Sequence, residues 1–167
     1  MSSKLGVVQD FIKRMGYVDF FKGTSPGNKE FSDRWKELAT LPKFGEDQHE
    51  YIRQTHYEPQ LKYLKENGID LTNRVNAVKD MVWSTSVQFG PRTTLIRFVL
   101  SENGYTPQMS NKDIITLVQN YKIKNNDKLF KSSSDRVKAG TLERAKAELK
   151  SLLTLDIELN IMNIKLE

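Results

Sequence analysis

The stretch that decides the fold is Asn73-Arg-Val-Asn-Ala-Val-Lys-Asp-Met-Val-Trp-Ser-Thr-Ser-Val-Gln-Phe89, which Gly90-Pro91 follows at once. Its apolar residues recur at the helical period and cover most of the helix circumference. A helix that is apolar on most sides usually lies buried at the centre of a domain. Glycine followed by proline ends such a helix, because proline cannot continue it. The pattern therefore predicts a central buried helix at residues 73–89.

The same helical period extends outward from this segment in both directions. We expect further helices at residues 2–14, 28–41, 44–67, 92–101, 110–121 and 141–153. Pro59 should break or kink the helix that contains it, since proline lacks the N–H group and clashes with the preceding turn. Residues 122–140 include the run Ser132-Ser-Ser134 and are expected to form a loop with at most one short helix. The sequence thus predicts an all-α fold of about six to eight helices around the central one.

No repeat, linker or low-complexity tract divides the sequence, so we expect residues 1–167 to form a single domain. Residues 154–167 could be a tail appended to that domain. Ile157, Leu159 and Ile161 alternate as in a strand, yet they also fit one face of a helix. We favour the helix for this segment.

Composition excludes several functional classes. The chain has no cysteine, which rules out disulfides, thiolate catalysis and cysteine-rich zinc sites. Its net charge of +5 suits an anionic partner, but the basic residues are spread out, which argues against nucleic acid. No apolar stretch approaches the roughly 20 residues of a membrane span. The N-terminus lacks the apolar core of a signal peptide, so we expect synthesis in the bacterial cytoplasm.

Neither the histidines nor the hydroxyl-bearing residues form a recognisable catalytic motif. His49 and His56 are seven residues apart, whereas two zinc ligands on one helix need a spacing of four. We therefore predict no metal and no cofactor. Ser84, Thr85 and Ser86 lack a nucleophile-elbow motif, and we expect their hydroxyls to bond back to carbonyls one turn earlier.

Polar residues on otherwise apolar helices are candidates for a binding groove. Gln48 and Thr55 lie seven residues apart on one predicted helix, and Gln88 lies at the end of the central helix. Buried amides and hydroxyls must find hydrogen-bond partners. These residues could form a satisfied internal network, or they could line a groove that binds sugar hydroxyls or amides.

Glycoside hydrolysis typically needs two carboxyl groups, one of them with a raised pKa in an apolar pocket. Most carboxylates in this sequence fit solvated helix faces, and no catalytic pair stands out. The catalytic residues are therefore unknown, and the candidates are Glu30, Glu50 and Asp80. Asp80 is the least trivial, because it precedes Met81-Val-Trp83 on the central helix, although it could pair with a nearby basic residue.

Several stretches in this order resemble one family. The most specific is Trp83-Ser-Thr-Ser-Val-Gln88, and the others include Phe31-Ser-Asp-Arg-Trp35, Gln48-His-Glu-Tyr51 and Thr55-His-Tyr-Glu-Pro59. Together they resemble the lysozyme-like, chitosanase-like muramidase domain of phage tail proteins and type VI secretion-associated proteins. The resemblance covers about residues 2–153.

The resemblance implies a lysozyme-like helical lobe that hydrolyses peptidoglycan and contacts its glycan strands. Gln48, Thr55, Tyr57 and Gln88 would be the substrate-binding residues. The family's general-acid glutamate belongs to a segment that precedes the matched residues, and we expect this chain to lack it. Loss of a general acid costs about 10²- to 10⁴-fold in rate, so we expect weak or no activity without that segment or a protein partner.

Two other functions stay open beside this hydrolase prediction. The chain could be a non-catalytic binding or inhibitor protein derived from such a lobe, or a structural component of a phage tail. A phage origin would place it on the virion, or in the periplasm or cell wall after delivery.

Overall fold

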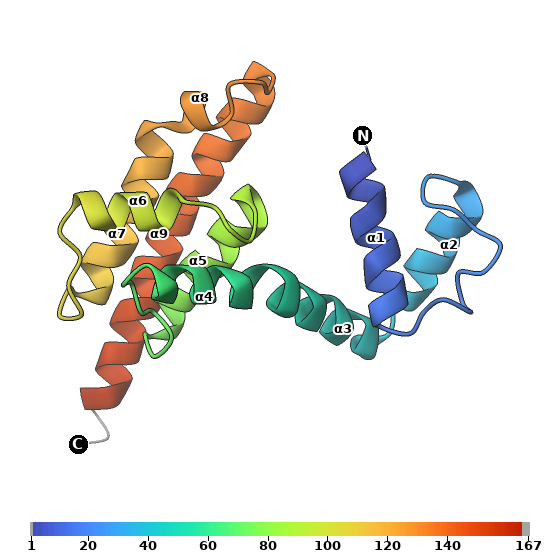
Figure 1. The fold of residues 1–167 in the computed structure, drawn as a ribbon, viewed down its shortest axis with the longest axis horizontal. Coiled ribbons are helices and arrows are strands. Elements are labelled where there is room, and N and C mark those ends of the chain that lie inside the picture. The colour runs from blue at the N-terminus through green and yellow to red at the C-terminus, as the bar shows by residue number, and fades with distance from the viewer. Residues whose placement is uncertain (1, 165–167) are drawn as a thin grey trace. The chain divides into compact units, whose positions relative to one another are not determined.

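The computed structural model describes the backbone of residues 2–164 and the side chains of residues 6–157. All regular secondary structure in this part of the chain is helical, which confirms the predicted all-α class. The elements of Figure 1 are α1 (Ser2–Arg14), α2 (Lys29–Leu38), α3 (Pro42–Ile52), the π-helical turn η1 (Arg53–Tyr57), α4 (Glu58–Glu66), α5 (Asn76–Phe89), α6 (Leu95–Glu102), α7 (Asn111–Lys124), α8 (Asn126–Leu129) and α9 (Asp135–Ile164).

The chain divides into two compact units, Met1–Thr55 (unit 1) and His56–Glu167 (unit 2). Each unit contains its own cluster of buried apolar side chains. The boundary between the units falls inside the π-helical turn η1. The prediction of a single domain over residues 1–167 stays a prediction, because separate cores do not decide whether two units fold together.

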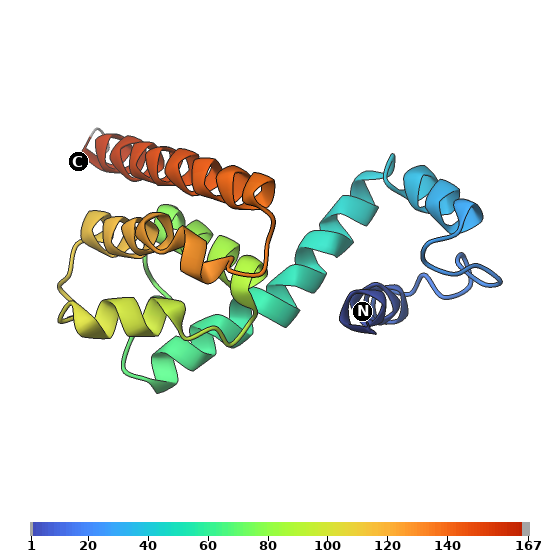
Figure 2. The same ribbon diagram turned by 90° about the horizontal axis from the view of Figure 1, so that it is seen from above.

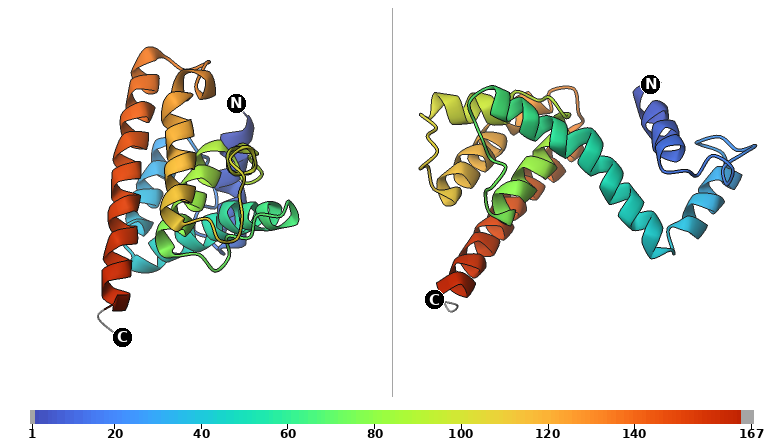
Figure 3. Two further views of the ribbon diagram at one scale, coloured as in Figure 1. Left: turned by 90° about the vertical axis from the view of Figure 1, so that its left-hand side faces the viewer. Right: turned by 60° about the horizontal axis from the view of Figure 1, so that its bottom comes forward.

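Unit 1 consists of α1, α2, α3 and the loop that joins α1 to α2 (Figure 3, right), and its core is mostly aromatic. The Phe11 ring lies 5.6 Å from Phe44 and 5.4 Å from Tyr51, edge to face in both cases. The Trp35 ring packs against Phe44 at 5.0 Å. Edge-to-face pairs add about 0.5–1.5 kcal/mol each beyond the burial of area, which helps to stabilise so small a unit.

Helix α5 is the buried centre of unit 2, as the apolar period predicted, although it begins at Asn76 rather than residue 73. Its buried side chains are Ala77, Val78, Met81, Val82, Thr85 and Ser86. Helices α4, α7 and α9 pack against it. Figure 2 and the left view of Figure 3 show α7 and α9 side by side and antiparallel.

Side-chain caps fix several helix starts. Asn28 accepts a hydrogen bond from the Phe31 N–H at 2.7 Å, which caps α2. Ser110 accepts from the Asp113 N–H at 3.0 Å and donates to the Asp113 carboxylate at 2.7 Å, which caps α7. Each such cap typically stabilises its helix by about 1 kcal/mol.

Two predicted features differ in the structure. Pro59 does not break the helical path, because residues 42–66 stay helical and the π-helical turn η1 lies just before it. Pro59 occupies the first turn of α4, where its missing N–H is tolerated. Helix α9 begins at Asp135, inside the predicted loop, because Ser134 accepts a hydrogen bond from the Val137 N–H at 3.4 Å.

The predicted helical tail agrees with the structure in its backbone, since α9 continues without interruption to Ile164. Ile157 is 58% exposed, and the side chains after it lie outside the described residues. That residues 154–167 are a separate appendage stays a prediction.

Candidate functional site

Two of the three candidate catalytic carboxylates, both in unit 1, form ion pairs on their own helices. Glu30 accepts a hydrogen bond from Arg34 at 2.7 Å, and its side chain is 61% exposed. Glu50 accepts from Arg53 Nε at 2.7 Å and from Gln54 Nε2 at 2.5 Å. These hydrogen bonds, led by that of Arg53, lower the pKa of Glu50 to about 2. A general acid needs a raised pKa, so this environment does not suit the role.

The two predicted groove residues of unit 1 do not share one site. Gln48 lies on the rim of an apolar cavity of about 140 Å³ that α1, α2 and α3 enclose. The other residues that line this cavity are Val7, Val8, Phe11, Trp35, Tyr51 and Ile52. The Thr55 hydroxyl instead donates to the Tyr51 carbonyl at 2.7 Å, one turn earlier on the same helical path. The Thr55 hydroxyl therefore has a hydrogen-bond partner within its own helical segment, which agrees with the alternative of an internal network.

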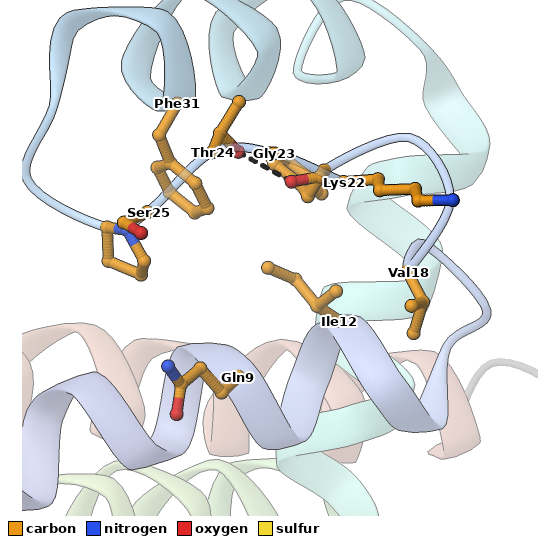
Figure 4. A pocket seen from close by; sticks show the side chains of 10 residues that line it. Gln9, Ile12, Val18, Lys22, Gly23, Thr24, Ser25 and Phe31 are labelled. Atoms are coloured by element: carbon orange, nitrogen blue, oxygen red, sulfur yellow. Dashed lines mark hydrogen bonds between the residues drawn. The ribbon is translucent and has the colours of Figure 1, made fainter.

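A larger cavity of unit 1, about 330 Å³, was not anticipated from the sequence. Figure 4 shows Gln9 and Ile12 of α1 on one side and Phe31 of α2 on the other, with the 22–26 loop between them. The Thr24 hydroxyl donates to the Phe21 carbonyl at 2.7 Å, which holds this loop in a turn. None of the residues predicted for a site lies in this cavity.

In unit 2 one predicted site residue, Tyr57, packs against an aromatic side chain of α5. The Tyr57 ring lies 5.5 Å from the ring of Trp83, at an interplanar angle of 38°. Asp80 precedes Trp83 by three residues on α5, a spacing that places both on one face of the helix. Glu58 follows Tyr57 at the start of α4.

Burial and nearby charges shift the pKa values of several groups around Tyr57. Partial burial raises the pKa of Tyr57, and the negative charges of Asp80 and then Glu58 raise it further. Partial burial likewise raises the pKa of Asp80 above its ordinary 3.8. Burial lowers the pKa of neighbouring His56, which favours its neutral form.

The basic residues that the sequence offered as partners for Asp80 lie elsewhere. Arg74 donates to the carbonyls of Pro107 and Met109, at 2.7 and 2.8 Å. Within the described part of the chain, Lys79 forms no ion pair with Asp80, and the Asp80 carboxylate has no hydrogen-bond partner. Asp80 is an exposed residue, and among the described residues no ion pair or hydrogen bond of its carboxylate is seen.

Gln88 lies near the C-terminal end of α5. It lies one turn after Ser84, a spacing that places both side chains on one face. Ser84 donates to Glu148 of α9, so this face is directed toward α9. As predicted, Thr85 and Ser86 donate back to carbonyls on their own helix, at 2.7 and 2.8 Å.

The sequence analysis did not predict a polar cluster that lies where α5, α7 and α9 meet. It consists of Ser84, Gln119, Lys122 and Glu148. Lys122 is 3% exposed, and its Nζ lies 3.8 Å from Glu148 Oε2. Gln119 is fully buried, and neither polar atom of its side chain has a hydrogen-bond partner. A lysine in the last turn of an amphipathic helix normally reaches solvent, so nothing in the sequence signalled this burial.

Neither a metal cluster nor a membrane span was found in the part of the chain that the structure describes. No three histidine or carboxylate side chains gather there in a way that could hold a metal ion. No helix of the described residues combines the length and the apolar character that crossing a membrane requires.

Comparison with known proteins identifies the family. Residues 1–149 match the model of the family described as type VI secretion system spike protein VgrG3-like, C-terminal. The chain is also 45% identical over 165 residues to the type VI secretion system spike protein VgrG3 of Vibrio cholerae. That alignment includes 95% of this chain but only 16% of the relative, so the chain spans about a sixth of the relative's length.

These findings correct the family and the function predicted from the sequence. The resemblance to a phage lysozyme-like muramidase domain is wrong, because the family match is to a spike protein. The prediction of a peptidoglycan hydrolase is therefore also wrong, and so is the prediction of peptidoglycan glycan strands as the main partner. Gln48, Thr55, Tyr57 and Gln88 were assigned as substrate-binding residues through that resemblance, and whether they bind a ligand stays a prediction. The chain belongs to the family of VgrG3-like C-terminal regions of type VI secretion system spike proteins.

Proposed function

We propose that this chain is a helical module of a type VI secretion spike and serves there as a structural component. The family match over residues 1–149 is the observation that carries this proposal. It favours the structural alternative, with a secretion spike in place of the phage tail that the sequence suggested. Synthesis in the bacterial cytoplasm, followed by delivery through the secretion apparatus, is part of the same proposal.

The packing of the two units suits a structural role. Each unit has its own buried core, so neither depends on a bound ligand to supply apolar contacts. Helix α9 is 30 residues long, about 45 Å at 1.5 Å per residue, and gives unit 2 a long continuous element. Regular helices with internal hydrogen bonds provide the rigidity that an assembly component needs.

Isolation of the spike assembly provides the test. The assembly would be purified from a bacterium that produces this chain and has an active type VI secretion system, and its peptides quantified by mass spectrometry. We expect peptides of the chain in a fixed ratio to those of the spike. We also expect the chain in the culture medium, and its loss from the medium when the secretion system is inactivated.

A matched variant separates assembly from mere production. Val118→Asp places a charge at a fully buried position of α7 and should unfold unit 2, whereas Asn120→Asp adds the same charge at an exposed position two residues away. The proposal expects Asn120→Asp to remain in the spike and Val118→Asp to be lost from it. Absence of the unaltered chain from purified spikes, or release of soluble fragments from purified peptidoglycan by the chain alone, would contradict a structural role.

A further inference from the structure

A small cavity of unit 2 lies where α6 packs against α7, beside the loop that joins α5 to α6. Its volume is about 180 Å³, and the rings of Phe89, Phe98 and Tyr121 form much of its wall. The Phe98 and Tyr121 rings lie 5.7 Å apart, edge to face. The side chains of Thr93, Thr94 and Leu129 also line the cavity. We call this cavity the aromatic pocket.

One wall of the aromatic pocket is open to solvent. Phe98 is 48% exposed, and it is the only aromatic residue of the exposed class among residues 6–157. Aromatic side chains are enriched at the centres of protein interfaces, where they fill pockets of the partner or form them. The single exposed aromatic ring of the described side chains thus borders a cavity that another group can enter.

Basic residues dominate the two segments that form most of the aromatic pocket. Residues 87–98 contain two arginines and no acidic residue, and residues 121–131 contain four lysines and one aspartate. One of these lysines, Lys122, is buried beside Glu148. The other five basic residues outnumber the single acidic residue by four, whereas the whole chain has a net charge of only +5. The fold therefore gathers much of the positive surplus of the chain around this pocket.

Three of these basic residues are exposed and close to the wall of the pocket, namely Arg92, Lys124 and Lys128. Each lies within three residues along the chain of a side chain that lines the pocket. None of them forms an ion pair within the described part of the chain. Three residues span about 4.5 Å of a helix, which is less than the Debye length of about 8 Å at physiological ionic strength. Their charges therefore act at the mouth of the pocket.

We propose that the aromatic pocket binds an aromatic side chain from an acidic segment of a protein partner. The volume of about 180 Å³ lies below the roughly 300–1,000 Å³ of sites for whole small molecules, and it suits a single side chain. Aromatic rings favour edge-to-face and offset contacts with other rings, which three aromatic walls provide. Carboxylates that flank the ring in the partner would meet the basic residues at the mouth. The proposal goes beyond the structural role in the spike, and it rests on that role only in taking the partner to be a protein.

The test uses the full chain, labelled with ¹⁵N, and the blocked peptide acetyl-Asp-Asp-Phe-Asp-Asp-amide as the probe. We expect this peptide to shift the backbone amide signals of Thr93 and Thr94 in a saturable manner. The peptide with alanine in place of phenylalanine has the same charge and should bind at least about fivefold more weakly. A pentathymidylate strand carries both negative charge and aromatic bases, but such strands are held by stacking several bases along a groove, and we expect it to bind more weakly than the phenylalanine peptide.

Two pairs of variants test the ring and the charges separately. Phe98→Ala should weaken binding of the phenylalanine peptide about fivefold or more, while Val137→Ala, an equally exposed apolar position on α9, should leave it unchanged. Lys124→Gln combined with Lys128→Gln should weaken binding of both peptides, whereas removal of the same charge at the exposed Lys112 and Lys150 should weaken it less.

Equal binding of the two peptides, unchanged binding by Phe98→Ala, or tighter binding of the pentathymidylate than of the phenylalanine peptide would overturn the proposal. The amide spectrum of each variant reports whether it is folded, and the lysine variants decide the question if Phe98→Ala unfolds. None of these outcomes bears on whether the chain is found in purified spikes, so the two proposals can fail separately.

Discussion

Replacement of Lys122 by methionine should stabilise unit 2. Burial lowers the pKa of Lys122 from its ordinary 10.5 to about 8, with Glu148 opposing this effect and Arg144 adding to it. At about 1.4 kcal/mol for each tenfold change in proton affinity, the buried charge costs the folded state about 3 kcal/mol at neutral pH. The 3.8 Å between Lys122 Nζ and Glu148 Oε2 is too long for a hydrogen bond that would offset this cost.

Methionine keeps the unbranched shape of lysine and removes the charge. Glu148 would lose its only basic neighbour at ion-pair distance among the described residues, but it would keep the hydrogen bond from Ser84 and remain 18% exposed. Because part of the gain is lost through Glu148, we expect a net increase of about 1–2 kcal/mol in the free energy of unfolding. Lys124→Met, an exposed position on the same helix, should change it by less than about 0.5 kcal/mol.

Urea denaturation at pH 7 measures this difference. In a Trp35→Phe background the fluorescence of the remaining indole, Trp83, reports on unit 2. Circular dichroism of the same samples follows both units together. If Lys122→Met proves less stable than its parent by 1 kcal/mol or more, the lysine and Glu148 form a net favourable pair and the reasoning is refuted.

The pH dependence of the same transition is a second consequence. The folded pKa of Lys122 lies below its unfolded value, so between about pH 8 and pH 10 the unfolded chain binds more protons than the folded chain. The free energy of unfolding should therefore rise with pH across this window. Above pH 10 the raised pKa of Tyr57 opposes the rise, because the unfolded tyrosine ionises first. Lys122→Met should abolish the rise, and a flat profile in the parent chain would show that Lys122 does not titrate there.

Three further substitutions test the packing and the caps by urea denaturation. Ile114→Ala removes a fully buried side chain of α7 and should destabilise unit 2 by about 2–4 kcal/mol. Ser110→Ala removes the acceptor for the Asp113 N–H and should cost about 1 kcal/mol, most of which Ser110→Asn should restore. Tyr17→Phe removes the 2.6 Å hydrogen bond to Asp47 and should destabilise unit 1 by about 1 kcal/mol.

Local signals in the sequence predicted much of the secondary structure. The apolar period located α5, and Asn28 and Ser110 marked the starts of α2 and α7. The predicted helix boundaries were wrong where a residue type can either end a helix or begin one. The expected helices 28–41 and 44–67 leave Pro42 between them, but proline suits the first turn of a helix, and Pro42 begins α3. Ser134 belongs to a serine run that resembles a loop, yet a single serine there is enough to cap α9.

The candidate site was harder to predict because it depends on contacts between segments far apart in the sequence. The spacing of seven between Gln48 and Thr55 suggested one shared face, but the Thr55 hydroxyl bonds to its own helix and Gln48 borders an apolar cavity. The pairing of Tyr57 with Trp83 joins residues 26 positions apart, which no helical period can reveal. The burial of Lys122 likewise depends on α9, whose first turn the sequence assigned to a loop.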